Sequence, residues 1–214
     1  MTAAVEALDH LLIGAPTLDV GISWLFDLTG VRAAPGGSHP GLGTWNALAS
    51  LGPRQYIEII APDPGQPDTE TFYVPGLRDL GEPRIATWAA RATGVRTEFL
   101  SRLPPEFSCD APREGSRVRP DGSRLAWTLA FPRHRDHATF GGLLPFFIEW
   151  RPGTTHPGTT TTPGLSLRSL SFRNPDPDVV RRALLALDLD ARIEASDRAS
   201  IGVSLETPRG AVTI

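Results

Sequence analysis

Two short apolar runs in the first third of the chain alternate in the way that is typical of β-strands. Residues 8–13 read LDHLLI and residues 55–60 read QYIEII. Successive side chains of a strand point to opposite faces of the sheet, so the pattern predicts that His10 shares a face with Leu8 and that Glu58 lies among isoleucines. An imidazole or a carboxylate in such surroundings is costly to bury without a partner. Both positions are therefore candidates for a functional site, or else a core histidine and a rim carboxylate paired with an arginine.

An amphipathic helix is predicted between these two strands. Thr17 can cap its N-terminus, Asp19 suits the positive end of the helix dipole, an apolar stripe covers residues 22–26, and Gly30 ends it. We therefore expect a helix over residues 17–29 that covers one face of a sheet.

A loop rich in glycine and proline follows over residues 35–43. Glycine permits a positive φ angle and a close approach of the backbone to a ligand, and loops of this kind often carry function. His39 in this loop is either a pocket histidine that supplies a proton or binds a substrate oxygen, or a solvated loop residue.

The order strand, helix, strand, strand, strand recurs twice after a proline-rich connection at residues 62–83. We predict an α+β protein made of three βαβββ modules, over residues 1–62, 84–152 and 164–214. The second module is expected to have a short helix over residues 95–103 and a middle strand over residues 116–119. In this module Trp88 takes the place of His10, and Glu149 takes the place of Glu58. The third module has Asp176, Pro177 and Asp178 at the start of a helix over residues 176–187 and Ser169 at the position of His10, which indicates a structural role.

The segments around His10, from Gly36 to Asn46 and from Tyr56 to Pro62 resemble the glyoxalase-like branch of the vicinal oxygen chelate superfamily, which also contains bleomycin resistance proteins and dioxygenases. The resemblance implies βαβββ modules with mixed sheets curled around a central cleft. Where members bind a divalent metal, its ligands come from the first and last strands. Members include lyases, isomerases, dioxygenases and metal-free binding proteins, so the fold alone does not name a reaction.

The resemblance implies a metal site formed by His10, Glu58 and Glu149. One nitrogen and two carboxylates suit Fe(II), Mn(II), Ni(II), Co(II) or Zn(II). The ion would bind two vicinal oxygens of a small substrate and stabilise a developing enolate as a Lewis acid. Either Glu58, displaced from the ion, or His39 would act as the base.

Further residues are predicted to contact the substrate: His39, Trp45, Asn46, Trp88 and His156. Of these, His156 lies in a loop that could fold over the cleft. A second hypothesis is a metal-free binding or sequestering protein of the same fold. Its support is that Trp88 and Ser169 stand where further imidazoles could be, so the ligand pattern is incomplete. In that case the tryptophans would form an aromatic slot, and His10 and Glu58 would form hydrogen bonds to the ligand or to each other.

Composition narrows the range of partners and locations. The 214 residues carry a formal net charge of −3, and the arginines are scattered without a basic stripe, so a nucleic-acid partner is disfavoured. Cys109 is the only cysteine, which excludes an internal disulfide and a thiolate zinc site. No apolar segment of membrane-spanning length or signal peptide is recognisable, so we expect a cytoplasmic protein, with a homodimer left open.

Overall fold

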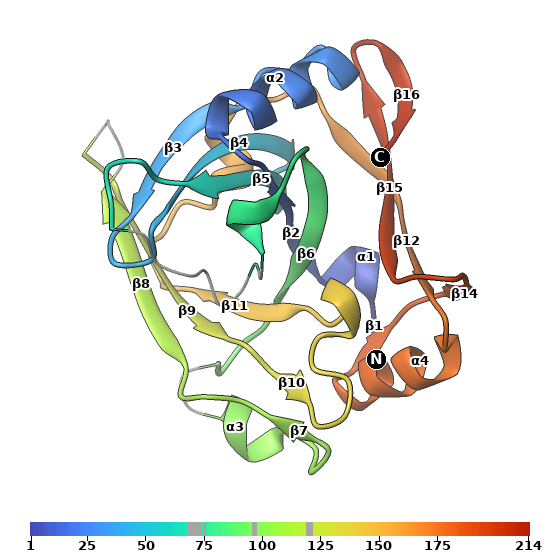
Figure 1. Cartoon of the computed structure of the whole chain (residues 1–214). Helices are drawn as coiled ribbons and strands as arrows, with labels where there is room; N and C mark the ends of the chain where they lie inside the picture. Colours follow the sequence, from blue (N-terminus) through green and yellow to red (C-terminus); the bar gives the residue numbers. More distant parts are fainter. Residues whose placement is uncertain (68–73, 75, 96–97, 119–121) are drawn as a thin grey trace.

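The computed structural model describes residues 1–67, 74, 76–95, 98–118 and 122–214. Its main element is an eight-stranded mixed sheet that curls until it is nearly closed, as Figure 1 shows. From one edge to the other, this sheet contains β3 (Ala34–His39), β4 (Thr44–Gly52), β5 (Gln55–Pro62), β2 (Leu8–Gly14), β6 (Arg84–Arg91), β11 (Phe146–Trp150), β9 (Arg124–Ala130) and β8 (Arg113–Val118).

The sheet consists of two halves with the same connectivity. In each half the first and last strands lie side by side and parallel, β2 with β5 and β6 with β11, and the two middle strands continue outward to the edge. The antiparallel pair β2 and β6 joins the halves. The first two predicted modules therefore share one sheet.

Each half has its helix after the first strand, but the two helices differ in length. Helix α2 (Leu18–Thr29) is capped as predicted: Thr17 accepts a hydrogen bond from the Val20 amide, and Gly30 has a φ of 78°. A Cβ at Gly21 would lie 2.4 Å from Ile59, so glycine allows α2 to pack closely on β5. Helix α3 (Phe99–Arg102) is a single turn, and residues 96–97 of the helix expected at 95–103 lie outside the described residues, as does residue 119 of the strand expected at 116–119.

The C-terminal unit has the predicted order of elements but a different topology. Its strands pair in the order β14, β12, β15, β16. The first strand of this unit, β12, therefore lies between β14 and β15. In each of the first two modules, by contrast, the first strand pairs with the last strand of the same module. The unit is therefore not a third copy of the same module. It contains β12 (Ser166–Asn174), α4 (Pro177–Ala186), β14 (Ile193–Ala195), β15 (Ser200–Thr207) and β16 (Gly210–Thr213).

Short elements complete the chain. The N-terminal β1 pairs with β13, and β7 pairs with β10. Among the described residues no helix is long and apolar enough to cross a membrane. The remaining elements are β1 (Thr2–Ala3), α1 (Ala4–Ala7), η1 (Leu77–Asp79), β7 (Phe107–Ser108), β10 (Arg133–His134), η2 (Phe140–Gly142), η3 (Pro157–Thr159) and β13 (Leu189–Asp190).

A β-bulge in β2 decides which side chains face the inside of the curl. Leu8 pairs with Ala90 and His10 pairs with Ala89, so Asp9 is the extra residue. As a result Leu8 packs in the larger core outside the curl while His10 lines the inside. The expectation that Leu8 and His10 share a face was wrong, because simple alternation does not hold across a bulge.

Candidate functional site

A cavity of about 650 Å³ occupies the inside of the curled sheet, with chemically different walls. The first half contributes polar side chains: His10, Ser38, His39, Asn46, Tyr56 and Glu58. The second half contributes an apolar, mainly aromatic wall: Trp127, Leu129, Phe131, Phe146, Ile148 and Trp150. Edge strand β8 adds charged groups, among them Arg113, Glu114 and Arg117.

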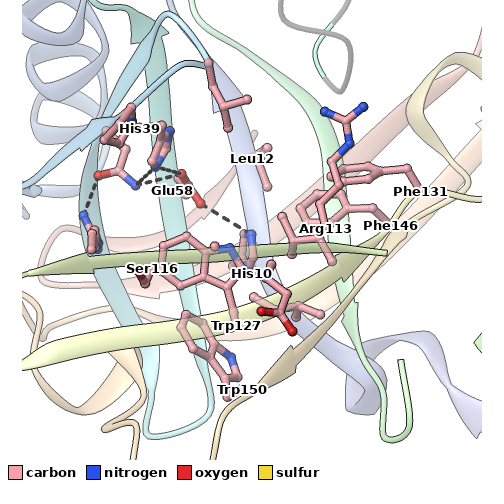
Figure 2. A pocket seen from close by; sticks show the side chains of 18 of the residues that line it. His10, Leu12, His39, Glu58, Arg113, Ser116, Trp127, Phe131, Phe146 and Trp150 are labelled. Carbon is pink, nitrogen blue, oxygen red and sulfur yellow. Dashed lines mark hydrogen bonds and ion pairs between the residues drawn. The ribbon is translucent and has the colours of Figure 1, made fainter. Parts of the chain in front are cut away.

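His10 and Glu58 meet on the polar wall, where they point toward one another (Figure 2). The adjacent parallel strands β2 and β5 pair His10 with Tyr56 and Leu12 with Glu58. His10 Nε2 lies 3.4 Å from Glu58 Oε2, and the two residues are 3% and 8% exposed. Both atoms thus lie at the cavity surface with little access to bulk water.

Tyr56 packs against this pair. Its ring stacks on the His10 imidazole, with 4.5 Å between ring centroids. Burial, followed by the charges of Glu58 and Asp9, raises the pKa of Tyr56 well above its usual value. The phenol therefore keeps its proton and contributes no charge to the cavity.

Asp9 lies behind His10 and holds its other ring nitrogen. Asp9 Oδ1 is 2.8 Å from His10 Nδ1, and Asp9 Oδ2 accepts hydrogen bonds from Trp150 Nε1 at 3.0 Å and His156 Nε2 at 3.1 Å. Burial alone would raise the pKa of Asp9, but the hydrogen bonds and charges of the two histidines outweigh it and lower that pKa well below the usual range. Asp9 is therefore a fixed buried anion.

Asn46 holds the second oxygen of Glu58 and also contacts His39. Asn46 Nδ2 donates to Glu58 Oε1 at 2.8 Å and lies 3.1 Å from His39 Nε2, while Asn46 Oδ1 accepts from Arg117 at 2.9 Å. Because the amide nitrogen only donates, His39 Nε2 must be the acceptor, and its Nδ1 hydrogen can reach Thr44 Oγ1 at 2.9 Å. Burial lowers the pKa of His39 against the opposing charge of Glu58, which agrees with a neutral ring.

The aromatic wall depends on a missing side chain in the edge strand. Gly115 on β8 pairs with Trp127 on β9, and a Cβ at Gly115 would lie 2.5 Å from Trp127 Nε1. Glycine at this position therefore lets the indole lie against β8.

Glu149 is not part of this cluster, which corrects the expected convergence of His10, Glu58 and Glu149. Phe146, Ile148 and Trp150 line the cavity from β11, whereas Glu149 does not and instead accepts a 2.9 Å hydrogen bond from the Gly94 amide. Its place in the sequence motif matched that of Glu58, but the parity of β11 directs it to the opposite face.

Two tryptophans expected at the substrate are core residues instead. Trp88 pairs with Leu11 and is fully buried, its Nε1 donates to the Leu143 carbonyl, and its ring packs against Phe172. Trp45 alternates with Asn46 along β4 and packs against the larger core, and its buried Nε1 has no hydrogen-bond partner within the described part of the chain. Neither side chain lines the cavity.

His156 lies behind Asp9 and does not line the cavity, so the expected contact of this histidine with the substrate was also wrong. Its Nδ1 accepts a 3.0 Å hydrogen bond from the Gly158 amide, which leaves the Nε2 hydrogen for Asp9. Its ring packs edge-on against Tyr56 and Trp150. The residue thus contacts the site through Asp9 and not through the substrate space.

Sequence reasoning missed several residues of the site. Asp9 offered a signal, since a carboxylate inside an apolar strand and next to a histidine needs donors if it is buried. Arg117 offered no local signal, because only the curl of the sheet brings edge strand β8 toward β4.

The donor set does not fit the divalent ion that the resemblance implies. Among the described residues, no three histidine, cysteine, aspartate or glutamate side chains are grouped so that they could hold a metal. Glu58 Oε1 and His39 Nε2 are both engaged by the amide nitrogen of Asn46, which cannot be a ligand. From β11 only the apolar residues Phe146, Ile148 and Trp150 line the cavity, so the last strand of the second half offers no ligand.

A curled sheet of two βαβββ halves around a polar and aromatic cavity is the arrangement expected of the glyoxalase-like class. The sequence matches the family model of a glyoxalase-like domain over residues 8–187. The chain belongs to this family. No curated protein matches it in sequence.

Three solved structures are similar to this chain. A hypothetical protein from Staphylococcus aureus is 15% identical with a TM-score of 0.69, and the match covers 90% of this chain and 87% of that chain. Methylmalonyl-CoA epimerase from Mycobacterium tuberculosis is 24% identical with a TM-score of 0.45, covering 71% and 93%. The corresponding epimerase from Streptomyces coelicolor is 17% identical with a TM-score of 0.42, covering 66% and 92%. The first similarity supports the fold, and the other two carry no conclusion about function.

Proposed function

We propose that this protein is an enzyme that moves a proton at a carbon atom next to a carbonyl group of a small substrate, with Glu58 and His10 as the acid–base pair. The observation that carries the proposal is the 3.4 Å approach of His10 Nε2 to Glu58 Oε2 in the wall of the cavity. Isomerisation, epimerisation and elimination all begin with such a step.

Each group has a definite task in the proposed step. The Glu58 carboxylate takes the proton from the substrate carbon. His10, protonated on both ring nitrogens, gives its Nε2 proton to the carbonyl oxygen, which has gained electron density from the broken C–H bond. Return of a proton to the same or a neighbouring carbon then gives the product. General acid–base catalysis of this kind contributes about 10²–10⁴-fold in rate.

The walls of the cavity indicate the type of substrate. The oxygen-bearing end would lie against His10, Glu58 and the polar first half, and an apolar body would pack on the aromatic second half. Arg117 adds positive charge on the polar side, where it holds Asn46. A small carbonyl compound with an apolar substituent satisfies both walls.

The proposal routes no step through a metal, because the residues present do not fit one. His10, Glu58 and His39 are used here as proton-transfer groups and hydrogen-bond partners. A bound ion of Fe, Mn, Ni, Co or Zn would require Asn46 to move away from Glu58 and His39, and elemental analysis of the purified protein tests for such an ion.

The aromatic wall favours a second candidate, a binding protein without turnover. Trp127 and Trp150 approach each other edge to face with ring centroids 5.8 Å apart and would hold an apolar ligand without any proton transfer. Their fluorescence reports binding independently of chemistry.

A deuterium-exchange screen separates the two candidates. A panel of 2-oxo acids, 2-hydroxy ketones and acyl thioesters is incubated with the protein in D₂O, and proton NMR follows the hydrogen next to the carbonyl. The enzyme hypothesis predicts that compounds that quench tryptophan fluorescence also exchange faster than in buffer alone. Compounds that bind without any protein-dependent exchange would contradict it and support the binding protein.

A further inference from the structure

Asp9 has an unusual position for a carboxylate, since it is completely buried and yet donors approach it from three sides. Its exposed fraction is 0%, and its neighbours His10, Trp150 and His156 come from β2, from β11 and from the start of η3. An ionised carboxylate only accepts hydrogen bonds, so each of these contacts requires a hydrogen on the partner.

The donors divide unequally between the two oxygens. Trp150 and His156 both contact Oδ2, and His10 alone contacts Oδ1. The indole can only donate, and His156 is fixed as a donor because its other nitrogen accepts from the Gly158 amide. These two contacts therefore set the orientation of the carboxylate independently of His10.

We propose that Trp150 and His156 are positioning residues that clamp Asp9 Oδ2, so that Oδ1 keeps a hydrogen on His10 Nδ1 and directs Nε2 toward Glu58. The catalytic meaning of this clamp rests on the proposed function, because it concerns the same histidine. The clamp itself is a property of the free protein. His156 thus acts on the reaction without touching the substrate.

Asp9 is an anchor and not a proton carrier in this arrangement. Its strongly lowered pKa means that it stays ionised while His10 gains and loses a proton at Nε2. A fixed anion on Nδ1 also stabilises the imidazolium form that the proposed step requires.

The clamp makes a specific prediction for Asp9→Asn. Trp150 and His156 are fixed donors, so the oxygen of the new amide must take the place of Oδ2 beside them. The amide nitrogen must then face His10 Nδ1. That ring nitrogen must then become the acceptor, and His10 must carry its hydrogen on Nε2. The substitution should therefore reverse the tautomer of His10 and not merely weaken a contact.

Nitrogen-15 NMR of histidine-labelled protein measures this directly, and the chain has only 5 histidines. His10→Gln and His156→Gln identify the two sets of signals. In the wild type we expect His10 Nδ1 and His156 Nε2 to be protonated. In Asp9→Asn we expect the His10 Nδ1 signal to move to the unprotonated region, and the combination of Asp9→Asn with His156→Phe and Trp150→Phe to restore protonated Nδ1 in part.

Three results would overturn the clamp. One is a wild-type His156 with its hydrogen on Nδ1, which needs no variant and remains decisive if Asp9→Asn does not fold. Another is an Asp9→Asn protein in which His10 Nδ1 is still protonated. The last is that the His10 signals of Asp9→Asn stay the same when His156→Phe and Trp150→Phe are added. His156→Gln, which keeps a donor, should preserve the wild-type His10 tautomer. Failure of the deuterium-exchange screen would sink the proposed function and leave these spectra unchanged.

Discussion

Arg117 on β8 donates a 2.9 Å hydrogen bond to Asn46 Oδ1 on β4, and this contact links the two ends of the curled sheet. Strand β8 is one edge of the sheet, and β4 lies next to the other edge. The bond also fixes the Asn46 amide, whose nitrogen holds Glu58 and His39. Closure of the sheet and order in the polar cluster therefore depend on the same side chains.

Gly36 tests this closure. A Cβ at this position would lie 2.2 Å from Asn46 Oδ1 and 2.5 Å from an Arg117 nitrogen, so Gly36→Ala must displace both. We expect a loss of about 1–3 kcal/mol in the free energy of unfolding, as for other overpacked sites. Urea denaturation measures it, with Gly81→Ala as control, because a Cβ there meets nothing within 4 Å. Equal stability of the two variants would contradict the account.

Glu149 tests which side chains of β11 face the cavity and which lie on the opposite face of the sheet. Glu149→Ala removes the acceptor of the Gly94 amide and should lower the free energy of unfolding by about 1 kcal/mol. Because this carboxylate does not line the cavity, ligand-induced quenching of tryptophan fluorescence should stay as in the wild type. If Glu149→Ala has normal stability but its tryptophan fluorescence is no longer quenched by a compound that quenches the wild type, Glu149 belongs to the site.

His39 gives the protein a pH-dependent stability. Burial lowers the pKa of His39 despite the opposing charge of Glu58, so the folded state takes up its proton at a lower pH than the unfolded state, where a histidine titrates at about 6.5. The stabilisation is present above that value and is lost as the pH falls through the lower folded pKa.

Denaturant unfolding at several pH values measures the effect. The wild type should lose stability between about pH 7 and pH 5 more steeply than His39→Gln, by at most about 1.4 kcal/mol per pH unit for one group. His137→Gln, at an exposed histidine, is the control and should behave as the wild type. A His39→Gln curve parallel to that of the wild type would show that the His39 pKa is not lowered.

Metal content is expected to be low. Protein purified without chelator should contain well below one equivalent of Fe, Mn, Ni, Co or Zn by elemental analysis, and EDTA should leave its thermal unfolding unchanged. The physical reason is that the Asn46 amide engages both Glu58 and His39. One equivalent of metal that is lost in His10→Ala, with the fold checked by circular dichroism, would contradict the donor-set argument.

The sequence predicted the first half of the site well, because local patterns decide it. Alternation placed Glu58 and Tyr56 on one face of β5. The segment predicted as a glycine-rich loop at residues 35–43 is largely edge strand β3, and its last residue, His39, still lines the same cavity. Helix α2 followed from its cap at Thr17 and its glycine at the end. Each of these features depends on neighbours within a few residues.

The second half of the site could not be predicted in the same way. One residue of offset in β11 separates Glu149 from the cavity face, and one bulge at Asp9 separates His10 from the face of Leu8. Offsets of this size leave the composition of a strand unchanged but reverse every side chain. The contact of His156 with Asp9 also depends on long-range packing, which no local pattern records.

The central claim is that Glu58 removes the substrate proton, and a comparison of two cavity carboxylates tests it most directly. Glu58 lies beside His10, whereas Glu114 lines the same cavity and pairs with Arg151. The measurement is the rate of deuterium exchange, under saturating conditions, into a compound found active in the screen. We predict that Glu58→Gln lowers this rate by about 10²–10⁴-fold while binding by tryptophan fluorescence is retained, and that Glu114→Gln changes it only a few-fold. A folded Glu58→Gln protein that binds the compound and exchanges it at the wild-type rate would contradict the account.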